Sequence, residues 1–297
     1  MSLKVGSRCG FCLLHRGYQQ ILRATEDEGV RLEAMRQLLV LHGEEFGPEA
    51  VPSVIGSDRD RIIRRVTGCP DTYAEMKRTA NEQALAFLPV MEEYMEGQPA
   101  ADRLRTACKI ACIANVIEYD VPGHSPDFDE VISRVGEENF YIDDLGDFEG
   151  LLEPGVKVLF LTDNAGEIAF DRLVVRELRG RGCVVTVAVK GGPSLNDALM
   201  VDAEAVGMVE EADQVITTGT DAVGVNLSET SEEFNGVYRG ANVILAKGMA
   251  NWETLTEYPA PCPTMFLFRA KCEPVATAVG VPLQSNVAKL VPEGWLL

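Results

Sequence analysis

The residues best suited to chemistry follow two short apolar runs in the second half of the chain. Run 157–161 leads into Asp163 and Asn164, and run 184–189 is followed, eight residues on, by Asp197. Two carboxylates and an amide carbonyl form a hard oxygen site, which suits Mg²⁺ or Mn²⁺, with Co²⁺ and Ni²⁺ as borderline alternatives, and suits zinc poorly. We expect Asp163, Asn164 and Asp197 to hold a divalent metal ion.

A lysine and two glycines follow other apolar runs and suit an anion. Lys247 and Gly248 follow run 242–246, and Gly219 follows run 214–218. A lysine ammonium and the backbone N–H groups exposed at glycines can hold a phosphate group. We therefore expect a phosphate to bind beside the metal ion.

Each of these residues also has a purely structural interpretation. Asp163 or Asn164 can cap the helix expected after them, with Glu167 reaching back as in a capping box. Asp197 can cap the next helix, and Lys247 can be a surface lysine. Their common position at the ends of parallel strands favours a site.

The apolar runs themselves predict the elements that position these residues. Their hydrophobicity is continuous rather than alternating, which is typical of strands covered on both faces, and the helical intervals between them supply crossovers. The pattern predicts a doubly wound, mostly parallel, Rossmann-like α/β domain of three α/β/α layers, in which the strand tips meet at one edge. The expected strands are 157–163, 184–189, 214–218, 242–246 and 265–268.

The first half of the chain predicts helices, because its apolar residues recur at helical spacing. Pro89 should kink the longest of them. The clearest break is the proline- and glycine-containing segment 122–126, and we expect a helical N-terminal region, 1–150, followed by a Rossmann-like metal- and phosphate-binding domain, 151–297. The expected helices are 13–28, 30–42, 58–66, 72–96, 100–118 and 127–135.

Cysteines offer a second possible metal site. Cys9 and Cys12 form a C-x-x-C pair, and Cys108 and Cys112, four apart on one helical face, could complete a four-thiolate zinc site. The alternative is that these cysteines are small buried hydrophobic residues. A structural Zn²⁺ at Cys9 and Cys12 is therefore one of two open interpretations.

Composition excludes several classes of protein. The chain has 297 residues, 46% of them hydrophobic, which is enough for a sizeable core and argues against disorder. Its net charge of −19 opposes binding to nucleic acid, and eight cysteines are too few for a disulfide scaffold. No run of about 18 apolar residues and no signal-peptide core occurs, so we expect no membrane partner and a cytoplasmic location. Nothing in the sequence predicts the oligomeric state.

The chain contains the motifs Asp-Asn-Ala-Gly-Glu at 163–167, Asn-Asp at 196–197 and Lys-Gly-Met-Ala-Asn at 247–251. Together these motifs resemble those of a known family, the metal-dependent damage-control phosphatases, also called domain of unknown function 89. The N-terminal C-x-x-C is similar to the small prokaryotic branch of that family. The resemblance implies a metal held by Asp163, Asn164 and Asp197, and a substrate phosphate held by Lys247.

The resemblance also implies residues that line the substrate side of the site. Glu167 and Asn251 fall on family motifs, and Asn115 corresponds to an asparagine of the helical part. The family usually has Gly-Asn-x-x-Asp there, whereas this chain has Ala114, Asn115 and Glu118. Together with Gly219, these residues form the expected substrate-binding set.

The implied activity is metal-dependent hydrolysis of small phosphorylated metabolites, such as sugar phosphates, phosphopantetheine-like compounds or damaged metabolites. Water can attack directly, or Asp163 can form an aspartyl-phosphate, but Ala165 stands where the haloacid-dehalogenase phosphatases carry a second aspartate. Two alternatives stay open. An S-adenosylmethionine-dependent methyltransferase uses a similar sheet but needs a glycine-rich first turn, and here Gly166 is alone. A non-catalytic metabolite-binding protein can share the fold.

Overall fold

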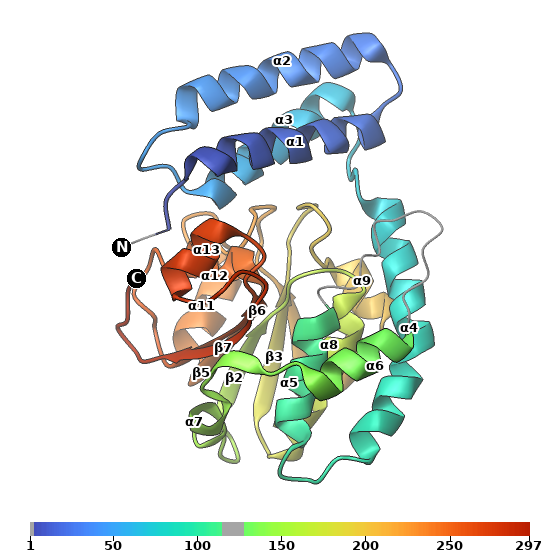
Figure 1. Ribbon diagram of the computed structural model, residues 1–297, viewed down its shortest axis with the longest axis vertical. Coiled ribbons are helices and arrows are strands. Elements are labelled where there is room, and N and C mark those ends of the chain that lie inside the picture. The colour runs from blue at the N-terminus through green and yellow to red at the C-terminus, as the bar shows by residue number, and fades with distance from the viewer. Residues whose placement is uncertain (1–2, 115–127) are drawn as a thin grey trace.

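The computed structural model describes residues 3–114 and 128–297, arranged as a small helical bundle above a larger α/β body (Figure 1). The bundle consists of α1 (Ser7–Ala24), α2 (Glu28–Glu45) and α3 (Pro52–Thr67). Its core is Ile21, Ala34, Leu38 and Ile63. Asp27 caps α2 by accepting a hydrogen bond from the backbone of Val30 at 3.0 Å, which begins that helix where the chain turns.

Three further helices come from the N-terminal half but lie against the sheet. They are α4 (Ala74–Glu96), α5 (Arg103–Ala114) and α6 (Phe128–Glu137). Phe87 of α4 meets Phe170 of α8 (Glu167–Gly180) edge-on, with ring centroids 6.1 Å apart. Pro89 lies within α4, which is one continuous helix in the structure.

The sheet has seven strands among the described residues, in the order β1-β7-β6-β5-β2-β3-β4. All neighbouring pairs are parallel except β6 and β7. The strands are β1 (Phe140–Asp143), β2 (Lys157–Leu161), β3 (Val184–Val189), β4 (Gln214–Thr217), β5 (Val243–Lys247), β6 (Thr264–Arg269) and β7 (Asn286–Val291).

Alternate residues of each central strand face opposite layers. In β2, Val158 and Phe160 belong to the core under α4, α5 and α8, whereas Leu159 and Leu161 belong to the core on the other face. The second face is covered by α11 (Glu232–Gly240), α12 (Met249–Leu255) and α13 (Glu273–Val279). Because both faces are buried, the strands carry apolar residues continuously.

The predicted α/β fold with a mostly parallel sheet is confirmed, and all five expected strands occur within two residues of their predicted ends. Two strands at one side of the sheet, β1 at its edge and β7 next to it, were not predicted from the sequence. Strand β1 and the short helix α7 (Leu145–Glu149) precede residue 151 and yet join the sheet and its core. The division of the chain at residue 150 stays a prediction. In the part of the chain that the structure describes, no helix is long and apolar enough to cross a membrane.

Candidate active site

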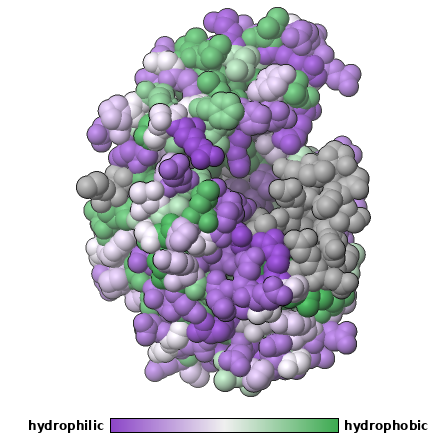
Figure 2. Space-filling view, in the orientation of Figure 1, coloured by the Kyte–Doolittle hydropathy of each residue, from purple (hydrophilic) through white to green (hydrophobic). Residues whose placement is uncertain are grey.

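The expected site residues lie where the strand order reverses. From β2 the chain proceeds to β3 and β4 on one side, and then returns to β5 and β6 on the other. Such a switch point leaves a crevice beyond the carboxyl ends of the two central strands. Asp163 and Asn164 follow β2 there, and Gly248 follows β5. Figure 2 shows a hollow lined by hydrophilic residues between the helical bundle and the sheet.

A short backbone bridge joins the two segments that carry the expected metal ligands. Asn164 and Asp197 form an isolated antiparallel β-bridge. Ala165 donates to the carbonyl of Asn196 at 2.9 Å, and Ala198 donates to the carbonyl of Asp163, also at 2.9 Å. The structure therefore brings together Asp163, Asn164 and Asp197, as the sequence predicts.

The loop after β5 packs directly against the side chain of Asp163. Gly248 has φ +85° and ψ 156°, a region that only glycine occupies readily. A Cβ built on Gly248 would overlap the carboxyl group of Asp163. Glycine at this position is therefore required for both backbone shape and space.

The amide of Asn164 is oriented by two neighbouring carboxylates. Its Nδ2 donates to Asp163 Oδ2 at 3.1 Å and to Glu167 Oε2 at 3.0 Å. Because the amide nitrogen makes both bonds, its carbonyl oxygen is the atom suited to a cation. Glu167 also takes part in a buried ion pair with Lys247.

Lys247 lies in a buried triad rather than alone at the strand end. Its Nζ contacts Asp171 Oδ1 at 2.5 Å and also contacts Glu167, and all three side chains are at most 1% exposed. Burial alone would lower the pKa of Lys247, but the Asp171 and Glu167 carboxylates outweigh it and raise the pKa. The lysine charge is thus offset within the protein, and its expected role in holding the substrate phosphate stays a prediction.

The acidic side chains at the switch point suit a cation. Burial, together with the charges of Glu167 and Asp197, raises the pKa of Asp163 to about 8. Burial also raises the pKa of Asp197, although Lys190 opposes it. A divalent ion would relieve this repulsion between carboxylates.

A buried amide at the same place supplies a further oxygen. Asn251 is 3% exposed, and its Nδ2 donates to the carbonyls of Thr162 at 3.1 Å and Lys247 at 2.7 Å. Its Oδ1 has no hydrogen-bond partner among the described residues. The donor set of two carboxylates and amide oxygens therefore fits a hard divalent ion.

Two lysines that were not among the predicted site residues also face the acidic group. Lys190 Nζ donates to the carbonyls of Ala222, at 3.0 Å, and Gly224, and lies 3.4 Å from Asp197 Oδ2. Burial lowers the pKa of Lys271, and the negative charges of Glu167 and Asp163 partly oppose this shift. Lys190 follows β3 directly and Lys271 lies two residues beyond β6. Their positions after predicted strands could therefore have placed both lysines at the same edge of the sheet as the other site residues.

The loop after β4 forms one wall of the site. Gly219 has φ +77°. Its backbone lies close to Gly191: a Cβ added to Gly191 would be 2.6 Å from the carbonyl carbon of Gly219. Gly191 donates to the carbonyl of Thr220 at 3.0 Å. Gly219 is exposed at this edge, and its contact with a substrate stays a prediction.

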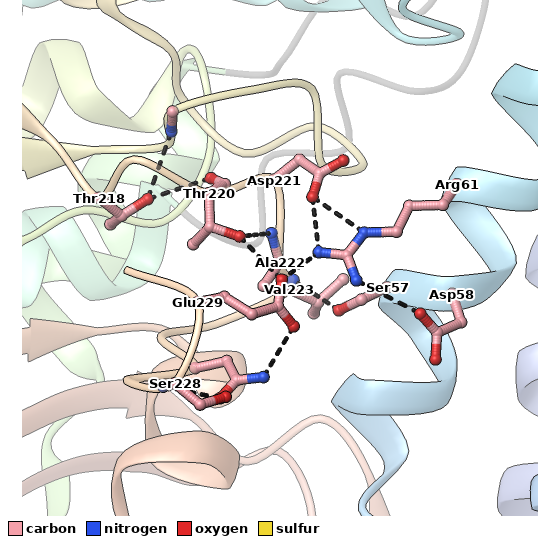
Figure 3. Close-up of polar contacts among 12 residues, drawn as sticks. Ser57, Asp58, Arg61, Thr218, Thr220, Asp221, Ala222, Val223, Ser228 and Glu229 are labelled. Carbon is pink, nitrogen blue, oxygen red and sulfur yellow. Dashed lines mark hydrogen bonds and ion pairs between the residues drawn. The ribbon is translucent and has the colours of Figure 1, made fainter. Parts of the chain in front are cut away.

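Helix α3 connects the bundle to this wall (Figure 3). Arg61 donates twice to Asp221 Oδ1, at 3.0 and 2.7 Å, and also pairs with Glu229. Ser57 Oγ accepts a hydrogen bond from the backbone of Val223 at 2.9 Å. Arg64 pairs with Asp221 and donates to the carbonyl of Pro193 at 2.5 Å. The bundle therefore closes over loops that follow both β3 and β4.

The remaining predicted residues lie either outside the described part of the chain or in the core. Asn115 and Glu118 lie outside the described residues, as does the break at 122–126. Cys108 and Cys112 are buried in the core, at most 1% exposed, with Cys112 Sγ 3.7 Å from Asn286 Oδ1. They behave as small core residues.

The cysteine that shares an environment with Cys9 and Cys12 is Cys272, at the start of α13. Burial raises the pKa of Cys272 to about 11, with contributions from Glu253 and from both of those thiols. Across residues 3–114 and 128–297, no group of three or more His, Cys, Asp or Glu side chains is placed to hold a metal ion. Zinc at Cys9 and Cys12 stays a prediction.

The fold and site define a class: an α/β protein with an acidic, oxygen-rich site at the switch point of its sheet. The family described as "Damage-control phosphatase ARMT1-like domain" matches residues 5–287. The chain belongs to this family, which supports a phosphatase.

Similar proteins extend over almost the whole chain. A protein named damage-control phosphatase from Archaeoglobus fulgidus is 34% identical over 292 residues, 97% of this chain and 100% of that protein. Another from Pyrococcus horikoshii is 32% identical, over 94% of this chain and 96% of its own length. The crystal structure of a DUF89 family protein from Pyrococcus horikoshii superposes with a TM-score of 0.88 at 30% identity and covers 98% of this chain and 99% of its own.

Proposed function

We propose that this protein is a metal-dependent phosphatase that hydrolyses a small phosphorylated metabolite. One observation carries the proposal: the bridge between Asn164 and Asp197 places two aspartates and an amide together at the switch point of the sheet. Burial and the charges of Glu167 and Asp197 raise the pKa of Asp163, and burial raises the pKa of Asp197; a bound cation would stabilise the ionised form of both. The relatives named damage-control phosphatases support a substrate among damaged metabolites.

In this proposal, Asp163, Asn164 and Asp197 hold the divalent ion. An ion bound there would polarise a phosphoryl oxygen and lower the pKa of a bound water. Asn164 owes its orientation to Asp163 and Glu167, and Gly248 leaves space for the Asp163 carboxyl group. Mg²⁺ and Mn²⁺ suit these oxygen ligands, and Co²⁺ or Ni²⁺ are borderline.

The remaining residues bind and orient the phosphorylated substrate. Lys271 faces Asp163 and Glu167 and can offset charge on the phosphate, together with Lys247. Gly219, Asn251 and Asn115 complete the proposed substrate side. Ala165, whose backbone is bound to Asn196, provides no acid for a leaving group, so we favour direct attack by water over an aspartyl-phosphate.

The test is phosphate release from a panel of sugar phosphates, phosphopantetheine and nucleotides, with chelator or with Mg²⁺ or Mn²⁺. We expect turnover only with metal, and loss of turnover and of Mn²⁺ binding in Asp163→Ala and Asp197→Ala. Equal turnover in chelator and in metal would overturn the mechanism. Metabolite binding without phosphate release from any substrate would favour the non-catalytic alternative, and methyl transfer from S-adenosylmethionine would favour the methyltransferase.

The proposed structural zinc is a separate matter. Cys9 and Cys12 lie in the first turns of α1, whose start packs near α13. Replacing both cysteines by serine should change thermal stability and leave turnover nearly unchanged. Metal analysis of the purified protein, with one Zn²⁺ per chain that the double variant lacks, would support this site.

A further inference from the structure

Asn81, in the middle of α4, makes two short hydrogen bonds to segments far away in the sequence. Its Oδ1 accepts from the backbone N–H of Gly166 at 2.7 Å, and its Nδ2 donates to Asp202 Oδ1 at 2.7 Å. Asn81 and Asp202 are each 4% exposed. The oxygen and the nitrogen of this buried amide are therefore both hydrogen-bonded, and leaving either without a partner would lower the stability of the folded protein.

The two partners of Asn81 belong to the two turns that carry the proposed metal ligands. Gly166 lies two residues after Asn164, in the turn that follows β2. Asp202 accepts, through Oδ2, the backbone N–H of Leu199 at 2.8 Å, and Leu199 lies two residues after Asp197. Asn81 thus joins the turn of Asp163 and Asn164 to the turn of Asp197.

Close packing at Gly166 supports the same conclusion independently. Gly166 has φ +77°, and a Cβ there would be 2.9 Å from Ala80 Cβ and 3.0 Å from the Ala80 carbonyl oxygen. Helix α4 therefore lies directly against this turn. One helical turn earlier on α4, Lys77 is 3% exposed and lies 2.6 Å from Asp71, and its charge opposes the rise in the pKa of Asp197 that burial causes.

We propose that Asn81 is a positioning residue of the metal site, setting the separation between the turn that carries Asp163 and Asn164 and the turn that carries Asp197. This inference rests on the proposed function, since it concerns the same metal ion. Residues that orient metal ligands through hydrogen bonds typically change metal affinity by about 10- to 100-fold when replaced. The helical half of the chain would then control metal affinity without supplying a ligand.

A reciprocal exchange tests this role. Asn81→Asp keeps the acceptor for Gly166 but sets two carboxylates against each other, and Asp202→Asn sets two amide nitrogens against each other. In the double variant, Asn81→Asp with Asp202→Asn, the amide at 202 donates to the carboxylate at 81 and still accepts from Leu199. The double variant therefore keeps all three hydrogen bonds, and only the bond between positions 81 and 202 has its donor and acceptor exchanged.

The measurement is Mn²⁺ binding to the full chain by calorimetry, with thermal melting of each variant. We expect each single variant to bind Mn²⁺ about 10- to 100-fold more weakly, and the double variant to return to within about threefold of the parent chain, since its three bonds are complete. Where Asn81→Asp melts below the assay temperature, Asp202→Asn, which adds no charge, serves for the comparison.

Thr264→Val is the matched control for the loss of one buried hydrogen bond. Thr264 is 3% exposed and donates to the carbonyl of Cys262 at 3.0 Å, at the start of β6 and therefore at the opposite edge of the sheet. It should lower the melting temperature and leave Mn²⁺ affinity unchanged. Folded single variants with parental affinity, or a double variant that does not recover, would overturn the inference. Absence of Mn²⁺ binding to the parent chain would instead overturn the proposed function itself.

Discussion

Gly248→Ala should inactivate the protein while leaving most of its fold intact. The glycine adopts φ +85° and ψ 156°, and another residue held there costs about 1–3 kcal/mol. The new Cβ would also overlap Asp163: its farthest carboxyl atom, Oδ1, would be only 2.5 Å away, where ordinary contact begins at 3.4 Å. Even Oδ1 must therefore move by about 0.9 Å to reach ordinary contact. The side chain has to make this movement, because Asp163 and Gly248 follow two strands, β2 and β5, that are paired with each other.

The cost should fall on activity more than on stability. Asp163 has a short side chain that can rotate away from the methyl group, so the overlap is relieved by displacing the proposed metal ligand. A displacement of about 1 Å can reduce turnover by about 100-fold, which corresponds to about 2.7 kcal/mol. We expect kcat/KM to fall by at least about 100-fold and Mn²⁺ affinity to fall with it.

Phosphate release, Mn²⁺ calorimetry and urea unfolding together test this prediction. Gly280→Ala is the matched control, because Gly280 also has a positive φ, +80°, and a Cβ added to it would meet no atom within 4 Å. It should lose about 1–2 kcal/mol of stability without loss of activity. A folded Gly248→Ala protein with parental Mn²⁺ affinity and turnover would refute the argument.

Three further predictions follow from the charges. Lys247→Met should lower the free energy of unfolding by about 3–5 kcal/mol in urea titrations, because it leaves Glu167 and Asp171 buried without their partner; an unchanged midpoint would contradict the triad. Burial raises the pKa of Glu253 to about 7 from 4.5, so the folded state holds a proton that the unfolded state releases. Stability from this group is complete below pH 4.5 and declines by up to about 3 kcal/mol as pH rises through 7, and the decline should be absent in Glu253→Gln. Asp221→Asn should cost about 1 kcal/mol or less, and the loss should shrink at high salt in melting experiments, because this ion pair with α3 is partly exposed.

The central strands, and the turns that carry the proposed metal ligands, could be predicted from the amino-acid sequence. Continuous apolar runs mark strands buried on both faces, and the polar residues that end them are necessarily at strand tips. This was sufficient to place Asp163, Asn164 and Asp197 at one edge, where the structure joins them by a β-bridge. Strands β1 and β7 were missed; β1, at the edge of the sheet, has only four residues and one buried side chain, so it leaves no apolar run in the sequence.

Which charged and amide side chains contact one another could not be predicted from the sequence. Lys247 lies beside Asp171 and Glu167 because β5 is the direct neighbour of β2, and no local pattern encodes that order. Asn81 occupies one of many polar positions on a long helix, and its role arises from the packing of α4 against the turns at Gly166 and Asp202. Periodicity along a chain reports which face of an element is buried, whereas partners distant in the sequence depend on how the elements are stacked.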